Sequence, residues 1–474
     1  MTTFQPVSPD LTALHASVRG ELLRPEDAPY EEARALFNGM IDKHPALIVR
    51  CADVADVIAA LKFGTESGLR VAVRGGGHNG GGLGSVEGGL LIDLGQLSGV
   101  RVDPEKRTVR VEGGALWGKV DHATHAFGLA VPSGIISTTG VGGLTLGGGL
   151  GYLTRKYGLT IDNLLEADVV LADGRLVTAS AQENSDLFWA LRGGGGNFGI
   201  VTSFLFQAQP VGTVVGGPTL WPLDQAGQVL RWYQEFIRNA PDGLNGFFAF
   251  LTVPPGPPFP AELHLKKMCG VVWCYSGPPE RADEVFAPIA AFGPPALHGV
   301  QPMPFPALQA AFDGLYAKGS QQYWRGDFFR AFSDEAVERL CLQAQAMPTM
   351  LSTIHLYPVG GAAHRVGQGD TAWSYRDADF AAVYYGVDPD AAKADQITDW
   401  TVQTHESLHD QSMGGSYVNF MMDEGQERVR ATYRDNYERL SRVKAKYDPN
   451  NVFSVNQNIR SGQSTVNRSD GGSL

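Results

Sequence analysis

The chain has few cysteines, no long hydrophobic run and no concentration of basic residues. Its four cysteines, at 51, 269, 274 and 341, are too few and too scattered for a disulfide framework, so we expect buried free thiols. No segment approaches the ~18 consecutive apolar residues of a membrane span, and the first 30 residues contain no apolar core of a signal peptide. We therefore expect a cytoplasmic protein that makes no membrane contact.

Charge argues against a further class of partner. The formal net charge is −12, and lysine and arginine form no run longer than a pair, whereas phosphate backbones require clusters of them. Nucleic-acid binding is therefore not expected. Apolar residues make up 43% and charged residues 19% of the 474, a composition typical of a globular enzyme with about two or three domains.

Glycine is in excess, with 59 residues that gather at 75–84, 140–151 and 193–199. The first block follows an apolar run at 71–73 and contains Arg-Gly-Gly-Gly-His-Asn-Gly at 74–80. Consecutive glycines let backbone N–H groups face an anion and let a bulky ligand touch the chain, as a pyrophosphate requires. The spacing also fits the fingerprint of NAD-binding domains, but more glycines and an apolar strand follow where that fingerprint needs a helix. A plain structural loop is the other interpretation.

Apolar runs alternate with helical patterns along the first half of the chain and predict an α+β fold with mixed sheets. Asp-Gly at 173–174, between apolar runs, predicts a hairpin. After Pro210, strand patterns at 246–253, 268–275, 352–359 and 380–385 alternate with helical ones at 223–239 and 334–346, which indicates an antiparallel sheet backed by helices. One long helix is expected over 433–446. The expected division is a helical segment at 1–44, domains at 45–210 and 211–430, a C-terminal return at 431–461 and a flexible tail at 462–474.

The second glycine block, within 132–152, is rich in small and hydroxyl side chains that let a flat ligand lie against the backbone. In chain order the sequence has the first block at 74–79, this second block, Arg-Lys-Tyr-Gly-Leu at 155–159, Leu-Phe-Trp-Ala-Leu-Arg-Gly-Gly-Gly-Gly-Asn-Phe-Gly at 187–199 and Tyr-Asp-Pro-Asn-Asn-Val-Phe at 447–453. This series resembles the berberine-bridge-enzyme-like branch of the vanillyl-alcohol-oxidase superfamily of FAD-dependent oxidoreductases, over residues 40–210 and 410–460. The resemblance implies a PCMH-type FAD-binding domain of two subdomains, with a substrate domain over the isoalloxazine ring.

The resemblance also implies which residues hold FAD. His78 matches the family histidine that bonds covalently to the flavin 8α-methyl group, a link that retains the cofactor and makes it a stronger oxidant. The other cofactor-binding residues that we expect are Arg74, Gly75, Gly76, Gly77, Asn79, Gly80, Ser137, Thr138, Gly140, Gly142, Gly143, Gly147, Gly148, Gly199, Ile200, Val201, Asn456 and Asn458.

The sequence departs from the family pattern at two positions. Many relatives attach the flavin a second time through a cysteine where this chain has Ile136, so we expect a single covalent link, through His78. Relatives often have Tyr-x-Asn-Tyr near the C-terminus, and the last tyrosine removes a substrate proton; here Phe420 stands in its place and cannot take a proton. The candidate catalytic residues are therefore Tyr417 and Asn419 of that motif and Tyr357.

Other side chains are candidates for the pocket wall or for a metal site. His355 shares a strand face with Tyr357, and Tyr323, Trp324, Arg325, Trp373 and Tyr384 add aromatic surface and one charge. The pairs His122/His125 and His405/His409 have helical spacing, and His405-Glu406-Ser407-Leu408-His409 matches the string of zinc proteases. A zinc hydrolase would leave the glycine blocks unexplained, so no metal is expected.

The sequence therefore predicts an FAD-dependent oxidase. It would move a hydride from a carbon that bears oxygen or nitrogen, in a small organic molecule, to FAD, and pass the electrons to O₂. The alternatives are a flavin-dependent tailoring enzyme of secondary metabolism that performs oxygenation or cyclisation, a dehydrogenase with another acceptor and, more remotely, the zinc hydrolase.

Overall fold

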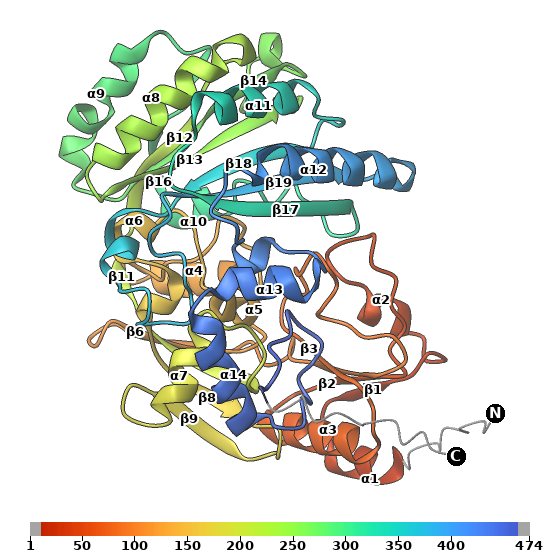
Figure 1. The fold of residues 1–474 in the computed structure, drawn as a ribbon. Helices are drawn as coiled ribbons and strands as arrows, with labels where there is room; N and C mark the ends of the chain where they lie inside the picture. Colours follow the sequence, from red (N-terminus) through yellow and green to blue (C-terminus); the bar gives the residue numbers. More distant parts are fainter. Residues whose placement is uncertain (1–10, 463–474) are drawn as a thin grey trace, which may run out of the picture.

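A four-stranded sheet begins the chain in the computed structural model, which describes residues 11–462 (Figure 1). Its strands are β1 (Glu21–Leu23), β2 (Leu47–Arg50), β4 (Leu90–Asp93) and β3 (Val71–Arg74), in spatial order. The central strand β4 pairs in parallel with both β2 and β3. The helices of this part are α1 (Leu11–Ser17), α2 (Tyr30–Arg34) and α3 (Val54–Glu66). The expected helical segment at 1–44 contains α1 and α2 but also β1, which was not predicted, because its three residues are too few to show a strand pattern.

A five-stranded antiparallel sheet follows. Its strands are β5 (Val100–Asp103), β6 (Thr108–Glu112), β10 (Ile200–Gln207), β8 (Leu164–Val170) and β9 (Leu176–Ser180), in spatial order. The predicted hairpin is confirmed, because β8 and β9 pair directly across Asp173 and Gly174. A small sheet joins β7 (Leu129–Ala130) to β11 (Gln209–Pro210). The helices here are α4 (Trp117–His125), α5 (Val141–Gly147), α6 (Thr154–Tyr157) and α7 (Ser185–Leu191).

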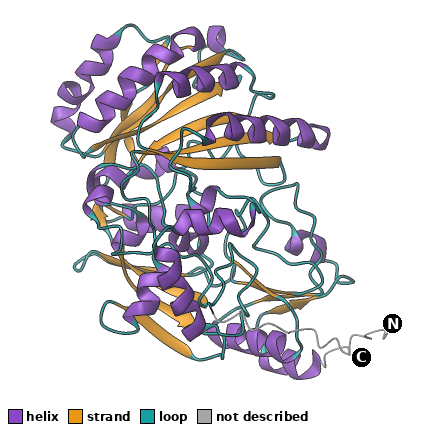
Figure 2. Cartoon of the chain, viewed as in Figure 1, coloured by secondary structure: helices purple, strands orange, loops and turns teal. Residues whose placement is uncertain are grey.

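The third sheet is larger and antiparallel, and helices cover its outer face (Figures 1 and 2). Its strands are β12 (Thr213–Pro222), β13 (Leu244–Thr252), β14 (Lys267–Tyr275), β15 (Leu297–His298), β16 (Gln301–Pro304), β17 (Gln321–Phe329), β18 (Thr353–Pro358) and β19 (Phe380–Asp388). The helices are α8 (Ala226–Asn239), α9 (Ala282–Phe292), α10 (Phe305–Gln309), α11 (Asp334–Gln345) and α12 (Ala394–His409). The antiparallel sheet backed by helices is thus confirmed, although β12 and β17 carry no strong strand signal.

The two faces of this sheet bury different cores. On β14, Cys269 packs with the residues beneath the helices, and Cys274 packs with those that face the first half of the chain. These two cysteines thus lie on opposite faces of the sheet, as their odd spacing along one strand requires, and all four cysteines are free thiols, as expected. The inner face, and not the helix-covered one, is therefore available to a ligand held between the two halves.

The chain ends in two helices that return to the first half, α13 (Gly425–Tyr433) and α14 (Asn436–Tyr447). The expected helix over 433–446 is confirmed from Asn436 onward as α14, but it starts later than predicted, because Arg434 has a φ of 44°, which a right-handed helix does not accommodate. In the last turn of α14, the buried Lys444 ammonium binds Asp448 at 2.6 Å and donates to the carbonyl oxygen of Asn197. The predicted tail lies almost wholly outside the described residues. None of the helices in the described chain combines the length and the apolar character needed to span a bilayer.

Candidate active site

A cavity lies between the glycine-rich loops of the first two sheets and the inner face of the third. All three glycine blocks line it, although they are far apart in the sequence. Residues 453–457, which follow α14, add a further wall. The blocks that the sequence places in series thus form one continuous site in space.

The first block leaves β3 at Arg74, beside the end of the neighbouring strand. Arg74 and Asp93 are register partners on β3 and β4, and their side chains form a buried ion pair at 2.7 Å. A second guanidinium nitrogen of Arg74, Nη1, is buried without a hydrogen-bond partner. No helix follows this loop, which returns directly to β4, so the NAD-type arrangement is excluded.

Glycine brings the first two blocks into backbone contact. A Cβ atom on Gly76 would lie 2.4 Å from the backbone nitrogen of Gly140, so no larger residue fits. At Gly143 and Gly196, by contrast, a Cβ would meet no atom within 4 Å, and both residues line the cavity. The wall is therefore flat backbone that leaves open space for a large ligand.

His78 stands in this wall with its imidazole oriented by two neighbours. Its ring stacks on Phe37 with a centroid separation of 3.8 Å, and Nε2 lies 3.2 Å from the hydroxyl of Thr138. Burial lowers the pKa of His78 to about 4, so the ring is neutral at neutral pH. When Nε2 carries the proton and donates it to Thr138, Nδ1 keeps its lone pair. A neutral imidazole is the nucleophilic form.

The C-terminal segment closes the cavity beside the third glycine block. Asn456 donates from Nδ2 to the carbonyl of Gly196 at 3.2 Å, while its Oδ1 is buried and unpaired. Asn197 binds the backbone of Gln457, which fixes the two segments side by side. An unpaired carbonyl oxygen next to the cavity suits a ligand that brings N–H or O–H donors.

The structure brings most of the predicted site residues to the cavity. Those that line it are Arg74, Gly75, Gly76, Gly77, His78, Asn79, Gly140, Gly142, Gly143, Gly147, Gly199, Ile200, Val201, Asn456, Tyr357, Tyr417 and Asn419. Those that do not line it are Gly80, Ser137, Thr138, Gly148 and Asn458.

Three of the residues outside the lining have a visible structural task. Gly80 lies against the indole of Trp324, Gly148 lies against Trp373, and Ser137 donates to Asp313, with its backbone nitrogen 2.9 Å from the same carboxylate. The direct contacts that we expected from them to FAD stay predictions.

The opposite wall comes from the inner face of the third sheet and is mostly aromatic. The residues that the sheet and its connecting loops contribute are Tyr316, Trp324, His355, Tyr357, Val383 and Tyr385. Among all described residues that line the cavity, Arg74 is the only one with a permanently charged side chain. This wall therefore suits an uncharged, flat ligand more than a charged one.

Tyr417, Asn419 and Phe420 reach the cavity from the segment before α13. The phenol oxygen of Tyr417 accepts hydrogen bonds from the backbone N–H of Gly149 and from Asn419 Nδ2, each at 2.8 Å. Burial raises the pKa of Tyr417 to about 12 against the effect of those two donors. With its oxygen so engaged, Tyr417 orients the segment and has little capacity left to take a proton.

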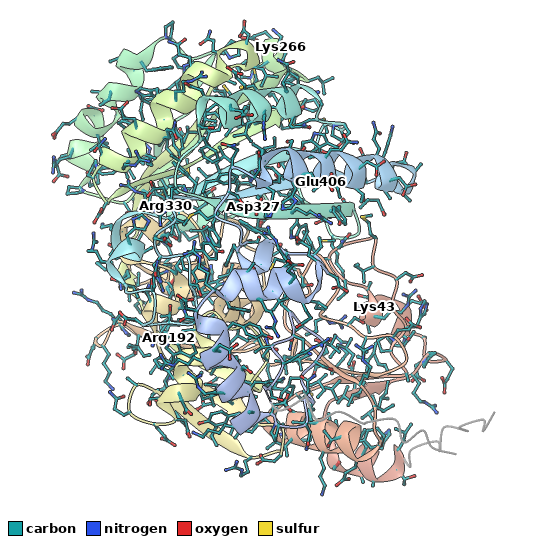
Figure 3. All side chains as sticks on the ribbon, in the orientation of Figure 1. Lys43, Arg192, Lys266, Asp327, Arg330 and Glu406 are labelled. Carbon is teal, nitrogen blue, oxygen red and sulfur yellow. The ribbon has the colours of Figure 1, made fainter. Side chains whose placement is uncertain are left out.

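The His405/His409 string does not form a protease site. Both histidines contact one carboxylate, that of Asp327 on β17, at 3.2 and 3.1 Å. Glu406 is exposed on α12, and Figure 3 labels it together with Asp327. The three residues could geometrically hold a metal ion, yet Arg428 already binds Asp327 at 2.6 Å and approaches His405 Nε2 to 3.3 Å. A guanidinium at this place opposes a cation, so the cluster is better described as a buried ion-pair network.

Sequence reasoning missed part of the aromatic wall. Tyr385, not the predicted Tyr384, faces the cavity, because neighbours on a strand point to opposite faces and Tyr384 packs under the helices. Phe37 and Tyr316 come from irregular segments that carry no pattern, whereas Trp324 was among the expected wall residues. Trp373 is buried behind the cavity.

Comparison with known proteins agrees with this geometry. Residues 45–180 match the sequence family described as FAD binding domain, and residues 416–460 match the family described as berberine and berberine like. An uncharacterized FAD-linked oxidoreductase of Bacillus subtilis (strain 168) is 32% identical over 447 residues, which are 93% of this chain and 96% of that protein.

Solved structures share the fold over nearly the whole chain. The 6-hydroxy-D-nicotine oxidase of Arthrobacter nicotinovorans has a TM-score of 0.82 at 24% identity, with 94% of this chain and 98% of that chain covered. The glucooligosaccharide oxidase of Acremonium strictum, which carries a 6-S-cysteinyl, 8α-N1-histidyl FAD, has a TM-score of 0.80 at 26% identity, with the same coverage of 94% and 98%.

Proposed function

The chain is an FAD-dependent oxidoreductase of the berberine-bridge-enzyme-like family, and from this premise we propose that it is an oxidase with its flavin attached through His78 alone. It would remove a hydride from a carbon that bears oxygen or nitrogen in a small organic molecule and use O₂ as the electron acceptor. The observation that carries the proposal is the single cavity in which three glycine blocks meet an aromatic wall. We assign FAD binding to residues 45–210 and 431–461 and substrate binding to 211–430.

The residues of the cavity fit FAD. Open space at Gly143 and Gly196 leaves room for a flat ring system against the backbone. The unpaired Nη1 of Arg74 and Oδ1 of Asn456 offer a donor and an acceptor to groups that a nucleotide cofactor brings. When bound, FAD supplies the two-electron acceptor for the oxidation.

The side chains around the cavity support the proposal of a single covalent link. His78 presents a neutral ring whose Nε2 is engaged by Thr138, which leaves Nδ1 as the nitrogen for attachment. Ile136 lines the cavity where relatives place a second, sulfur link, and none of the four cysteines lines it. These side chains support attachment of the flavin at one point, whereas the glucooligosaccharide oxidase named above carries a flavin with two links.

The decisive experiment compares wild type with His78→Ala after acid denaturation. We expect flavin absorption and in-gel fluorescence to stay with the wild-type polypeptide and to be lost from the variant, because only the histidine link survives unfolding. Flavin on a cysteine-containing peptide would contradict the single link.

A second experiment tests the oxidase activity. Alcohols, sugars, amines and polyketide-like compounds are added to the holoenzyme without oxygen, and bleaching of the flavin identifies substrates. Oxygen consumption with hydrogen peroxide release would support the oxidase, whereas dye reduction alone would indicate a dehydrogenase. Insertion of oxygen into the product, seen by mass, would indicate a tailoring oxygenase.

A further inference from the structure

Two polar side chains of β18 form a closed pair in the aromatic wall. His355 Nδ1 and the phenol oxygen of Tyr357 are 2.9 Å apart, on the same face of the strand. Both residues are over nine-tenths buried, with 3% and 7% of their surface exposed, and both line the cavity. The pair is therefore a hydrogen-bonded unit that a bound substrate would touch.

The pair lies next to the position where the family's proton acceptor is missing. The ring of Tyr357 is 5.6 Å from that of Phe420, centroid to centroid, and Phe420 in turn packs on Tyr417 at 4.8 Å. A phenol is thus present beside Phe420, but on the opposite wall of the cavity. Tyr417 does not compete for this task, because two donors already engage its oxygen.

The surroundings of the pair are uncharged. The titratable groups that face it are the phenols of Tyr152, Tyr316 and Tyr385, and burial raises the pKa of each of them. Burial also raises the pKa of Tyr357 and lowers that of His355 to about 3. In the described part of the chain no carboxylate, lysine or arginine contacts either residue, so at neutral pH the imidazole is neutral and its Nδ1 can accept a hydrogen bond from the Tyr357 hydroxyl.

We propose that Tyr357 and His355 together are the base of the reaction, with Tyr357 contacting an uncharged substrate hydroxyl and His355 holding the proton behind it. This inference rests on the oxidase function proposed above and adds the group that removes the proton.

The proton transfer balances the hydride transfer. When bound, FAD would supply the acceptor for the hydride that leaves the substrate carbon, while the substrate O–H bond breaks and a C=O bond forms. The hydroxyl proton goes to the Tyr357 oxygen, and the phenolic proton of Tyr357 goes to His355 Nδ1. The substrate thus loses one hydride and one proton as its C=O bond forms, and His355 holds that proton.

The same geometry selects the class of substrate. An amine that is protonated at neutral pH would need a carboxylate partner, and the described lining of the cavity contains none. A sugar chain would bury many hydroxyls against aromatic rings that offer few hydrogen bonds. A neutral, flat molecule with one reacting hydroxyl needs neither a carboxylate partner nor many hydrogen bonds, so this is the substrate class that the cavity fits.

The test uses the holoenzyme and 4-nitrophenol, a flat hydroxyl compound whose absorption changes when it ionises. We expect the apparent pKa of the bound probe to be about one unit lower in wild type than in His355→Gln. At any one pH, the ratio of ionised to neutral bound probe should then be about tenfold higher in wild type. Tyr357→Phe should also leave the bound probe neutral. The probe 4-nitroanisole, which has no proton to lose, should bind to all three proteins without this change.

Two further variants separate a proton-accepting role from a structural one. In Tyr357→Phe/Phe420→Tyr a phenol is restored on the opposite wall, and we expect ionisation of the probe to return in part. Tyr323→Phe removes a half-exposed phenol outside the cavity and should behave as wild type. The flavin spectrum of each protein shows whether FAD is held, so failure of the FAD assignment is distinct from failure of the base. Absence of binding by 4-nitrophenol, or equal ionisation in wild type and His355→Gln, would overturn the inference.

Discussion

The phenol oxygen of Tyr417 accepts a hydrogen bond of 2.8 Å from the backbone N–H of Gly149, 268 residues earlier in the chain. This bond ties the segment before α13 to the second glycine block, beside the cavity. Gly149 itself has a φ of 80°, and a Cβ there would collide with Thr160, so the loop adopts this shape only with glycine. This buried donor and acceptor thus help to hold the C-terminal and N-terminal parts of the site together.

Removing that acceptor should cost stability without removing the flavin. In Tyr417→Phe the Gly149 N–H stays buried without a partner, so we expect the free energy of unfolding to fall by about 1–3 kcal/mol. Urea denaturation of the holoenzyme measures the change, and the flavin-to-protein absorbance ratio should stay at the wild-type value. Tyr323→Phe is the control, since its phenol accepts only one weak contact of 3.5 Å from Arg325. Equal stability of the two variants would contradict the proposed tether.

A buried ion pair joins the two halves of the molecule. Arg376 donates two hydrogen bonds to Asp162, at 2.7 and 2.6 Å, and only 2% and 8% of the two side chains is exposed. Arg376→Ala leaves the carboxylate buried without its partner, and we expect a loss of about 3–5 kcal/mol in the free energy of unfolding. The matched control is Arg281→Ala, which breaks a surface pair with Glu284 and should cost less than about 1 kcal/mol. A similar loss in both variants would show that the buried Arg376–Asp162 pair contributes no more to the free energy of unfolding than the surface pair.

Two glycines of the site should respond differently to alanine. In Gly76→Ala the new methyl group meets the backbone of Gly140, which cannot move aside, so we expect a loss of about 1–3 kcal/mol together with reduced flavin content. In Gly143→Ala the methyl group enters open space in α5, and we expect unchanged or slightly higher stability with reduced flavin content only. Thermal unfolding and the flavin absorbance of purified protein measure both effects. Full flavin content in both variants would argue against the glycine wall as the cofactor site.

The network around Asp327 should make stability depend on pH. The hydrogen bond to Asp327 raises the pKa of His409, so the folded protein binds this proton more tightly than the unfolded chain does. The contribution of His409 is therefore complete below its unfolded pKa and is lost as the pH rises through the folded value. We expect the Tm difference between wild type and His409→Gln to be larger at pH 5.5 than at pH 8.5.

The same network has an acidic limit. Burial alone would raise the pKa of Asp327, but hydrogen bonds from His405 and His409 and the charge of Arg428 hold it below the usual value. Its contribution is present above the unfolded pKa of a carboxyl group and disappears as the pH falls through the folded one. Asp327→Asn should therefore lower the Tm at pH 7 and converge with wild type in strong acid. For the preceding prediction, a Tm difference between wild type and His409→Gln that is the same at pH 5.5 and pH 8.5 would show that the His409 imidazole does not titrate in the network.

The sequence alone indicated the α+β fold, because strand periodicity is a local property, and the family resemblance of its motifs implied FAD and a set of site residues most of which line the cavity. It also indicated the missing base, since Phe420 has no group that accepts a proton. Only the tertiary structure decided that Tyr385 rather than Tyr384 faces the cavity, that Tyr417 is engaged by Gly149, and that Asp327 and Arg428 complete the histidine pair of α12. Each of these depends on the pairing of strands and loops that lie far apart in the chain, and no local pattern records which residues such pairing brings together.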